Sequence, residues 1–294
     1  MKQKQIFTFR DAEKQVAPAA FSIMLKPAGS ACNLDCHYCY YLDKAVQYGG
    51  RQAVMDDQLL ELCIKQYIRA NEVDTVQFCW HGGEPLLLGL DFYRRAMELQ
   101  RRYADGKRIE NTLQTNGTLV DEAWCDLFAA NNFLVGLSLD GPGDIHDAFR
   151  LTRGGIVPPG HEGARLAGWS VSAEGYGRFL CDVFDEWVVS DVGRCFVQLF
   201  DASLAQWCGV RPGVCSMGET CGDALVVEHN GDVYPCDHFV YPGYRLGNIR
   251  ETPLAELYRS QKRREFGLDK RNTLPAECLR CNYYFACRGE CPKH

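Results

Sequence analysis

Three closely spaced cysteines are the residues in this chain best suited to chemistry. Cys32, Cys36 and Cys39 lie in the run ACNLDCHYCYY, with the spacing CxxxCxxC. Three thiolates on one loop can bind three irons of one [4Fe–4S] cluster, which leaves the fourth iron open to chelate a cofactor or substrate. A zinc site with His37 as its fourth ligand is the alternative, but structural zinc usually takes paired CxxC ligands. The spacing therefore favours an iron–sulfur site.

Two further groups of cysteines lie in the last third of the chain. The first group is Cys215, Cys221 and Cys236, and the second is Cys278, Cys281, Cys287 and Cys291. The second group has the pattern CxxCx5CxxxC, which is typical of metal ligands; taken alone it suits one zinc ion equally well. Together, the three groups favour iron–sulfur clusters.

Six cysteines remain outside these groups. They are Cys63, Cys79, Cys125, Cys181, Cys195 and Cys208. Most of them fall within apolar helix or strand patterns, where a cysteine acts as a small hydrophobic residue. We expect them to be core residues without a chemical role.

Composition narrows the class of protein. The 294 residues are 46% apolar and 24% charged, with a net charge of −6 and a pI near 5.7, which gives no electrostatic support to a nucleic-acid or anionic-membrane partner. The basic run from Lys262 to Arg264 is expected on a solvated helix face. The first residues contain no apolar stretch of about 7 to 15 residues, and no window of ~18 apolar residues is present. The sequence therefore predicts a cytoplasmic protein, in which clustered cysteines bind metal.

Strand and helix patterns alternate through the first half of the chain. Strands are expected at Phe21–Leu25, Thr75–Trp80, Asn111–Thr115 and Phe133–Leu139, and helices after Asp56 or Asp57, at Leu90–Tyr103 and at Asp121–Ala130. Such alternation predicts parallel βα units. The motifs HGGEP, QTNGT and SLDGP follow successive strands, so they are expected together at the carboxyl ends of the sheet.

The alternation stops after Arg150, with four strands in place, so a closed barrel is not expected. A helix is predicted at Glu174–Val189, a hairpin at Ala224–Pro235 with a type I′ turn at Asn230-Gly231, and a helix at Pro253–Arg264. The fold class is therefore α/β: a shortened, partial (β/α) TIM-like barrel with a small cysteine-rich domain. The expected boundaries are an N-terminal extension at 1–20, the partial barrel at 21–155, a linker and helical segment at 156–210, and the cysteine-rich domain at 211–294.

These motifs together resemble a known family. CxxxCxxC after the first strand and GGEP after the second resemble the radical S-adenosylmethionine (AdoMet) superfamily, and the C-terminal cysteines resemble its SPASM auxiliary-cluster domain. More narrowly, the runs CNLDCHYCYYLDK, FCWHGGEPLL, QTNGTL, SLDGP, HNGDVYPCDHF and CNYYFACRGECPKH are similar to the anaerobic sulfatase-maturating enzymes. The resemblance covers nearly all of the chain except about residues 151 to 170.

The resemblance implies an activity and a cofactor site. The family oxidises a cysteine or serine of a sulfatase to 3-oxoalanine (formylglycine). The open iron of the first cluster chelates the amino and carboxylate groups of AdoMet, and reductive cleavage yields methionine and a 5′-deoxyadenosyl radical. The residues implied at the AdoMet site are Tyr38, Gly82, Gly83, Glu84, Ser138 and Arg150. Glycines allow close backbone approach, Glu84 suits the ammonium group, and Arg150 suits the carboxylate.

The resemblance also implies a base, auxiliary ligands and partners. Asp237, directly after Cys236, matches the family's proton acceptor; the residues alone instead favour a turn aspartate bonded to a nearby backbone amide. In the family pattern Cys215, Cys221, Cys236 and Cys291 bind one auxiliary [4Fe–4S] cluster, and Cys278, Cys281 and Cys287 belong to another. The implied partners are a sulfatase polypeptide with a CxPxR or SxPxR motif and an electron donor such as a flavodoxin or ferredoxin.

Two departures from the family pattern leave alternatives open. The sequence stops at His294, three residues after Cys291, so the family's last ligand of the second auxiliary cluster is absent from it. Material on the order of two βα units, of roughly 30 residues each, is missing between Arg150 and the helix at Glu174. The alternatives are another SPASM peptide maturase, such as a thioether-forming enzyme, and an inactive, internally deleted cluster-binding protein.

Overall fold

The computed structural model describes residues 20–36, 38–41, 44–48, 54–150 and 172–293. His37, most of the expected N-terminal extension and the segment 151–171 lie outside the described residues. The chain divides into two compact units, each of which combines two separate stretches of sequence. The first unit holds residues 1–158 and 222–264, and the second holds residues 159–221 and 265–294.

The first unit is built on one sheet. Its strands are β1 (Ser22–Lys26), β2 (Thr75–Trp80), β3 (Arg108–Thr115), β4 (Phe133–Leu137), β5 (Ala224–Glu228), β6 (Asp232–Tyr234) and β7 (Gly247–Asn248). The strand order is β4-β3-β2-β1-β5-β6-β7. The pairs from β4 through to β5 are parallel, and the last two pairs are antiparallel. The predicted α/β class with parallel βα units is confirmed.

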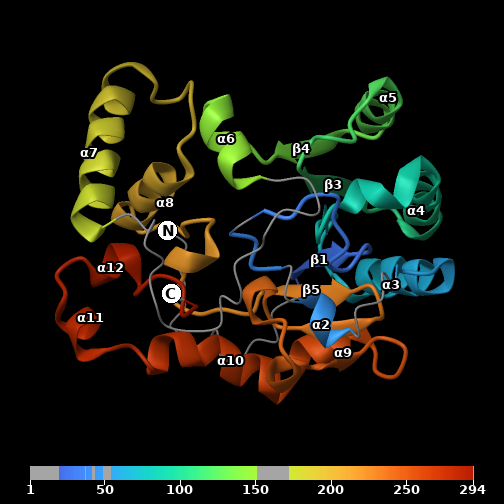
Figure 1. The fold of residues 1–294 in the computed structure, drawn as a ribbon. Helices are drawn as coiled ribbons and strands as arrows, with labels where there is room; N and C mark the ends of the chain where they lie inside the picture. The colour runs from blue at the N-terminus through green and yellow to red at the C-terminus, as the bar shows by residue number, and fades with distance from the viewer. Residues whose placement is uncertain (1–19, 37, 42–43, 49–53, 151–171, 294) are drawn as a thin grey trace, which may run out of the picture. The chain divides into compact units, whose positions relative to one another are not determined.

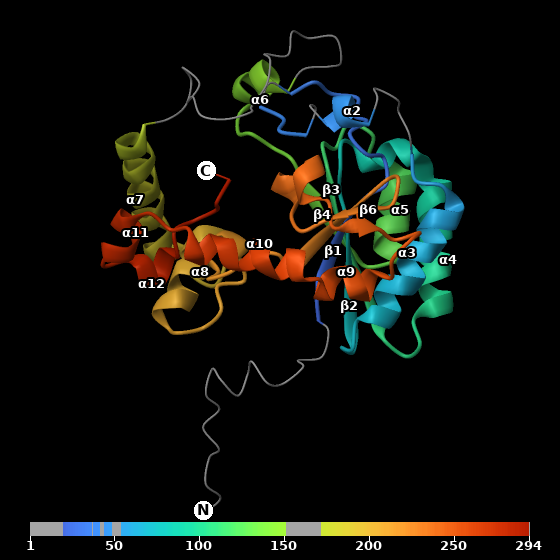
Figure 2. The same ribbon diagram turned by 90° about the horizontal axis from the view of Figure 1, so that it is seen from below.

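Helices cover one face of this sheet. The helices of the unit are α2 (Lys44–Gln47), α3 (Asp57–Ala70), α4 (Gly89–Tyr103), α5 (Glu122–Ala130), α6 (Gly143–Phe149) and α9 (Leu254–Arg259), with short 3-10 turns η1 (Pro85–Leu88), η3 (Asp237–Phe239) and η4 (Pro242–Tyr244). Figure 1 shows α3, α4 and α5 side by side along one face. In Figure 2, α2 and α6 lie at the end of the sheet toward which β1 runs.

Strand alternation separates an apolar face from a polar one. Ile23 and Leu25 of β1 are buried in the main core together with the helices, because alternate side chains of a strand point to opposite faces. Met24 instead packs in a second, small cluster on the other face. Lys26 shares the direction of Met24 and is fully buried. The face opposite α3–α5 therefore carries buried polar groups at its carboxyl end.

Two expectations about the C-terminal part need correction. The hairpin at 224–235 was expected in a separate domain beginning at residue 211, but β5 pairs in parallel with all five residues of β1. This pairing satisfies backbone groups that β1 would otherwise leave exposed at an edge. The helix expected at Pro253–Arg264 is two helices, α9 and α10 (Gln261–Asn272). Ser260 is extended between them, and its hydroxyl accepts a hydrogen bond from the Arg263 amide, as a helix-capping residue does.

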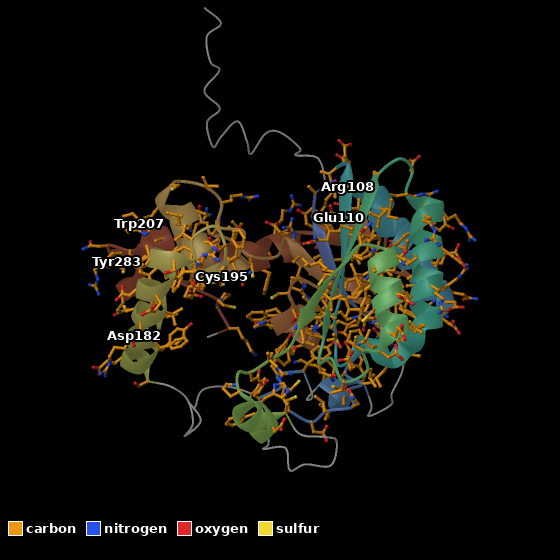
Figure 3. All side chains as sticks on the ribbon, turned by 90° about the horizontal axis from the view of Figure 1, so that it is seen from above. Arg108, Glu110, Asp182, Cys195, Trp207 and Tyr283 are labelled. Atoms are coloured by element: carbon orange, nitrogen blue, oxygen red, sulfur yellow. The ribbon has the colours of Figure 1, made fainter. Side chains whose placement is uncertain are left out.

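The second unit is helical. It contains α7 (Ala173–Ser190), α8 (Gln198–Trp207), the turn η2 (Cys215–Met217), α11 (Ala276–Arg280), α12 (Tyr284–Cys287) and α10 from Glu265 onward. The Trp187 and Phe200 rings lie 5.4 Å apart and join α7 to α8. Trp207, labelled in Figure 3, makes an edge contact with Phe285 at 4.7 Å and so joins α8 to α12. No helix of the described residues is long and apolar enough to cross a membrane.

The core assignment of the six remaining cysteines was wrong for four of them. Cys63 is buried and Cys79 is partly buried. The exposed ones are Cys125, Cys181, Cys195 and Cys208. Cys195, labelled in Figure 3, lies in the segment after α7. A cysteine is small enough to occupy the outer face of an amphipathic helix, so its presence in an apolar pattern does not identify the buried face.

The N-terminus of α3 provides a stability prediction. Asp56 caps the helix, since its carboxylate accepts a 2.7 Å hydrogen bond from the Leu59 amide. This bond is the main cause of the lowered pKa of Asp56. Asp56→Ala is expected to lower the free energy of unfolding by about 1 kcal/mol at neutral pH, measured by chemical denaturation. The difference should shrink as the pH falls through the lowered pKa, because protonation removes the same stabilisation.

Asp57→Ala, one residue later, is the control for this capping prediction. An equal loss of stability in Asp57→Ala would contradict the capping role of Asp56.

Candidate active site

Two loops at the carboxyl ends of β1 and β2 pack backbone against backbone. The Gly83 amide donates to the Gly29 carbonyl at 2.8 Å, and the Glu84 amide donates to the Ala31 carbonyl at 2.7 Å. A Cβ atom on Gly83 would lie 2.0 Å from the Ala31 oxygen. Gly82 has φ = +127°, which strongly favours glycine. The two glycines therefore hold the GGEP motif against the turn that precedes Cys32.

Glu84 ties the β2 loop to the β3 loop. Its fully buried carboxylate accepts hydrogen bonds from the Leu86 amide, the Thr115 hydroxyl and the Asn116 amide at 2.9 to 3.0 Å. Burial raises the pKa of Glu84 despite these donors. Both oxygens thus already have partners within the protein, and contact of Glu84 with the amino group of AdoMet stays a prediction.

The sulfur atoms of the first cysteine motif lie in surroundings suited to a cluster. The Leu34 amide and the Asn116 side chain point at the Cys32 sulfur, at 3.3 and 3.8 Å. Burial raises the pKa of Cys32, and raises that of Cys36 to about 11 against the opposing charge of Arg150. Hydrogen bonds to sulfur are typical around iron–sulfur clusters. Among the described residues, no three Cys, His, Asp or Glu side chains gather closely enough to bind a single metal ion. In a [4Fe–4S] cluster each thiolate binds a different iron, and the Cys36 thiol interacts electrostatically with both Cys32 and Cys39. The three thiols therefore lie near one another, and the donor set fits the cluster.

Tyr38 and Arg150 meet at an aspartate that the motif analysis did not single out. Arg150 donates two hydrogen bonds to Asp140, at 2.8 and 3.0 Å, and Tyr38 donates a third. The Arg150 bonds are the main cause of the lowered pKa of Asp140. Ser138, directly after β4 and two residues before Asp140, accepts a 2.9 Å hydrogen bond from Gln114 of β3. The SLDGP motif was the available signal for Asp140, since it ends a strand on the expected face.

Asp237 lies in a buried polar group on the face opposite α3–α5. The buried Lys26 ammonium forms an ion pair with one carboxylate oxygen, and the Tyr40 hydroxyl donates to the other. Burial, the largest single influence, would raise the pKa of Asp237, but the charge of Lys26 and the hydrogen bonds from Lys26 and Tyr40 act together to bring this pKa below its usual value. Asp237 does begin the turn η3, but among the described residues its carboxylate is bonded to these two side chains rather than to a backbone amide. Asp237 is an ionised carboxylate that can accept a proton.

A second carboxylate lies on the same face. Glu228, fully buried at the end of β5, accepts a hydrogen bond from the Tyr41 hydroxyl. The Lys26 ammonium lies 3.5 Å from the centre of the Tyr41 ring. Sequence reasoning missed Lys26 and Glu228, although a charged residue at the end of an apolar strand was a visible signal for each. The two tyrosines after Cys39 thus connect the cysteine loop to both carboxylates.

His81 of the HGGEP motif is neutral in this structure. Burial, with a smaller contribution from the charge of Lys26, lowers its pKa to about 4. Its Nδ1 atom accepts a 2.7 Å hydrogen bond from the Gly82 amide. A neutral imidazole adds no positive charge near Asp237, so Lys26 is the main cation acting on that carboxylate.

The auxiliary cysteines are divided between the two units. Cys236 directly precedes Asp237 in the first unit. The second unit holds Cys215, Cys221, Cys278, Cys281, Cys287 and Cys291. The four-cysteine set implied for one auxiliary cluster combines Cys236 with cysteines of the second unit, so its assembly stays a prediction.

Comparison with known proteins identifies the class and then the family. The profile of the radical SAM superfamily matches residues 27–156, and that of the SPASM iron–sulfur cluster-binding domain matches residues 215–282. The chain is thus a radical SAM protein with an iron–sulfur cluster-binding domain. A serine-type anaerobic sulfatase-maturating enzyme of Bacteroides thetaiotaomicron is 42% identical over 92% of this chain and 82% of its own length. The chain belongs to the family of anaerobic sulfatase-maturating enzymes.

Other relatives support the same family. A cysteine-type anaerobic sulfatase-maturating enzyme of Clostridium perfringens is 32% identical, covering 92% of this chain and 88% of its own. The solved structure of native anSMEcpe with bound AdoMet has a TM-score of 0.81 at 30% identity, covering 92% and 89% of the two chains. The Bacteroides alignment runs over 342 positions, more than the 294 residues here, so that relative has segments without a counterpart in this chain. This agrees with the missing βα units that the sequence predicts.

Proposed function

We propose that this protein oxidises a serine or cysteine of a sulfatase polypeptide to formylglycine, using AdoMet and iron–sulfur clusters. The family supplies the reaction class. One hydrogen bond carries the assignment to this chain: the Tyr40 hydroxyl donates to the Asp237 carboxylate. Tyr40 directly follows Cys39, and Asp237 directly follows Cys236. In this proposal Asp237 is the proton acceptor; it is bonded to the loop that would hold the AdoMet cluster and follows a proposed ligand of an auxiliary cluster.

The chemistry requires a hydrogen atom, a proton and an electron to leave the target residue. When bound, the first cluster and AdoMet would supply the radical that abstracts the hydrogen atom from Cβ. For a serine, loss of the hydroxyl proton and one electron then leaves the aldehyde; for a cysteine, the corresponding thioaldehyde requires water to release sulfide. Asp237 accepts the proton, and Lys26 and Tyr40 hold its carboxylate in place. Cys236 would help to hold an auxiliary cluster, which would supply the acceptor for the electron.

We assign the binding of the cofactor to residues in the loops at the carboxyl ends of the strands. Cys32, Cys36 and Cys39 hold the cluster with its open iron. Gly82, Gly83 and Glu84 shape the loop on the β2 side, and Tyr38, Ser138 and Arg150 form the β4 side. The pairing of Arg150 with Asp140 holds the guanidinium in place and leaves Nη1 outside the two bonds to Asp140. Contact of Arg150 with the carboxylate of AdoMet is part of this proposal.

The relatives differ in the residue that their names or bound peptides indicate, which is either serine or cysteine. Solved structures of anSMEcpe contain the Kp18Cys or the Cp18Cys peptide with AdoMet, whereas the Bacteroides and Klebsiella relatives are serine-type. We propose a polypeptide substrate with a CxPxR or SxPxR motif and a flavodoxin or ferredoxin as the reductant. The reaction takes place in the cytoplasm under this proposal.

One experiment tests the function. The protein is reconstituted anaerobically and incubated with AdoMet, dithionite and peptides that carry SxPxR, CxPxR or AxPxR, with the target Cβ deuterated. We expect 5′-deoxyadenosine that contains deuterium, and an aldehyde on the serine or cysteine peptide but not on the alanine peptide. Mass spectrometry reads both products.

Each other result would reject a specific part of the proposal. Absence of 5′-deoxyadenosine with all peptides would indicate an inactive cluster-binding protein. Formation of 5′-deoxyadenosine without deuterium, and with unchanged peptides, would leave a radical SAM enzyme of another substrate class. A thioether product from the cysteine peptide would favour the other type of peptide maturase.

A further inference from the structure

A buried lysine of α10 is bonded to the loop that carries two auxiliary cysteines. The side chain of Lys270 is only 3% exposed. Its ammonium donates to the main-chain carbonyls of Cys215, Ser216 and Gly218, at 3.2, 2.5 and 2.6 Å. All three of its N–H groups therefore have an acceptor within one short loop.

The far end of this loop is held by the same helix. The Cys221 amide donates to the Gly267 carbonyl at 3.1 Å, and a Cβ atom on Gly267 would lie 2.4 Å from the Cys221 oxygen. From α8, Gln206 donates a 2.7 Å hydrogen bond to the Met217 carbonyl. Contacts from α8 and α10 therefore hold the backbone at both ends of the loop between Cys215 and Cys221.

The charge of Lys270 has no anionic partner in the described part of the chain, where no carboxylate lies within 4.0 Å of its ammonium. The nearby Arg271 pairs with Glu219 on the same loop, so that carboxylate has its own partner. Carbonyl dipoles solvate a buried ammonium only in part, and a buried charge without a counter-charge is costly. A negatively charged group beside the Cys215 loop would balance it.

We propose that Lys270 is the counter-charge and positioning residue of the auxiliary cluster bound by Cys215 and Cys221, and that its charge raises the reduction potential of that cluster. This inference rests on the proposed function only through the presence of the cluster. A cluster with thiolate ligands is anionic, and it becomes more negative by one charge when it accepts the electron that leaves the substrate. A fixed positive charge stabilises the more negative form, which favours acceptance of that electron.

The test compares charge-keeping and charge-removing variants of the full-length, reconstituted protein. Lys270→Arg keeps the charge and the donors, Lys270→Gln keeps donors only, and Lys270→Met keeps neither. Lys262→Met is the matched control, because Lys262 lies on the same helix, is exposed and donates to a single carbonyl. Cys215→Ala identifies the signal of the cluster concerned.

The readouts are iron content and the midpoint potentials from redox titrations followed by electron paramagnetic resonance. We expect Lys270→Gln and Lys270→Met to lower the midpoint potential of the cluster that Cys215→Ala removes, with the AdoMet cluster unchanged. Lys270→Arg should restore most of the potential, and Lys262→Met should match the wild type. Loss of about four irons per chain in both neutral variants, with retention in Lys270→Arg, would equally support the counter-charge role.

Other outcomes would overturn the inference. An unchanged potential and iron content in Lys270→Met would remove the electrostatic role, and so would an equal shift in Lys270→Arg. Full iron content in Cys215→Ala would show that no cluster depends on this loop. None of these measurements requires a peptide, so a protein that shows the shift but does not oxidise SxPxR or CxPxR peptides would reject the proposed function and leave this inference standing.

Discussion

Asp237→Asn is expected to leave AdoMet cleavage intact while slowing aldehyde formation by about 10²- to 10⁴-fold, the usual contribution of a general base. The asparagine keeps the size and the hydrogen-bonding oxygen of Asp237, but it cannot accept the proton at neutral pH. The measurement compares 5′-deoxyadenosine with aldehyde in single-turnover reactions. Uncoupling of the two products is the specific signature of a lost base, because a lost cofactor site would reduce both.

The buried partner of Asp237 requires its own control. Removing the carboxylate leaves the Lys26 ammonium buried without that ion pair, which by itself destabilises a protein. The double variant Lys26→Met with Asp237→Asn removes both charges and should show the same uncoupling. Asp223→Asn, at an exposed aspartate that pairs with Arg263, should behave as the wild type. Aldehyde formation at the wild-type rate in both Asp237 variants would eliminate this residue as the base.

Gly83→Ala is expected to destabilise the protein by about 3 kcal/mol and to reduce the occupancy of the AdoMet cluster. The added methyl group would lie 2.0 Å from the Ala31 carbonyl, which is a backbone atom and cannot rotate away. The turn from Gly29 to Ala31 would have to move, and Cys32 follows it directly. Chemical denaturation and iron content measure the two effects.

A glycine with open space around it offers the matched control. Gly143, at the start of α6, has nothing within 4 Å of an added Cβ, so Gly143→Ala should preserve stability and iron content. Equal stability of Gly83→Ala and Gly143→Ala would show that the loops move apart easily. In that case close packing would not be the reason for glycine at position 83.

The sequence predicted the parallel part of the sheet well, because local patterns define it. β2 was expected at Thr75–Trp80 and has those bounds, and of the two expected caps of α3, Asp56 and Asp57, the structure has Asp56. The spacing of apolar residues that marks a strand or a helix can be read within a short segment, without knowledge of its distant contacts. The place of β5 beside β1 was missed, since strand pairing between residues 22–26 and 224–228 depends on contacts about 200 positions apart.

Some residues of the candidate site could be found from the sequence, and others only from the structure. Spacing singled out the cysteines as candidate ligands, and the resemblance to the family singled out GGEP and Asp237. Lys26, Asp140, Glu228 and Lys270 emerged only from the structure. Lys26, Glu228 and Lys270 each act through partners that are distant in the sequence. Asp140 lies in the SLDGP motif, but one of its partners, Tyr38, is 102 positions away.

By itself, the sequence determined the chemistry available to this protein: thiolates at cluster spacing, glycines where loops approach closely, and an aspartate beside a ligand. Only the tertiary structure decided the ionisation and orientation of those groups. Asp237 is a carboxylate because Lys26 is buried against it, and the Cys215 loop is held because Lys270 points into it. Burial and charge are set by the folded neighbours of a residue, and folding chooses those neighbours from the whole chain.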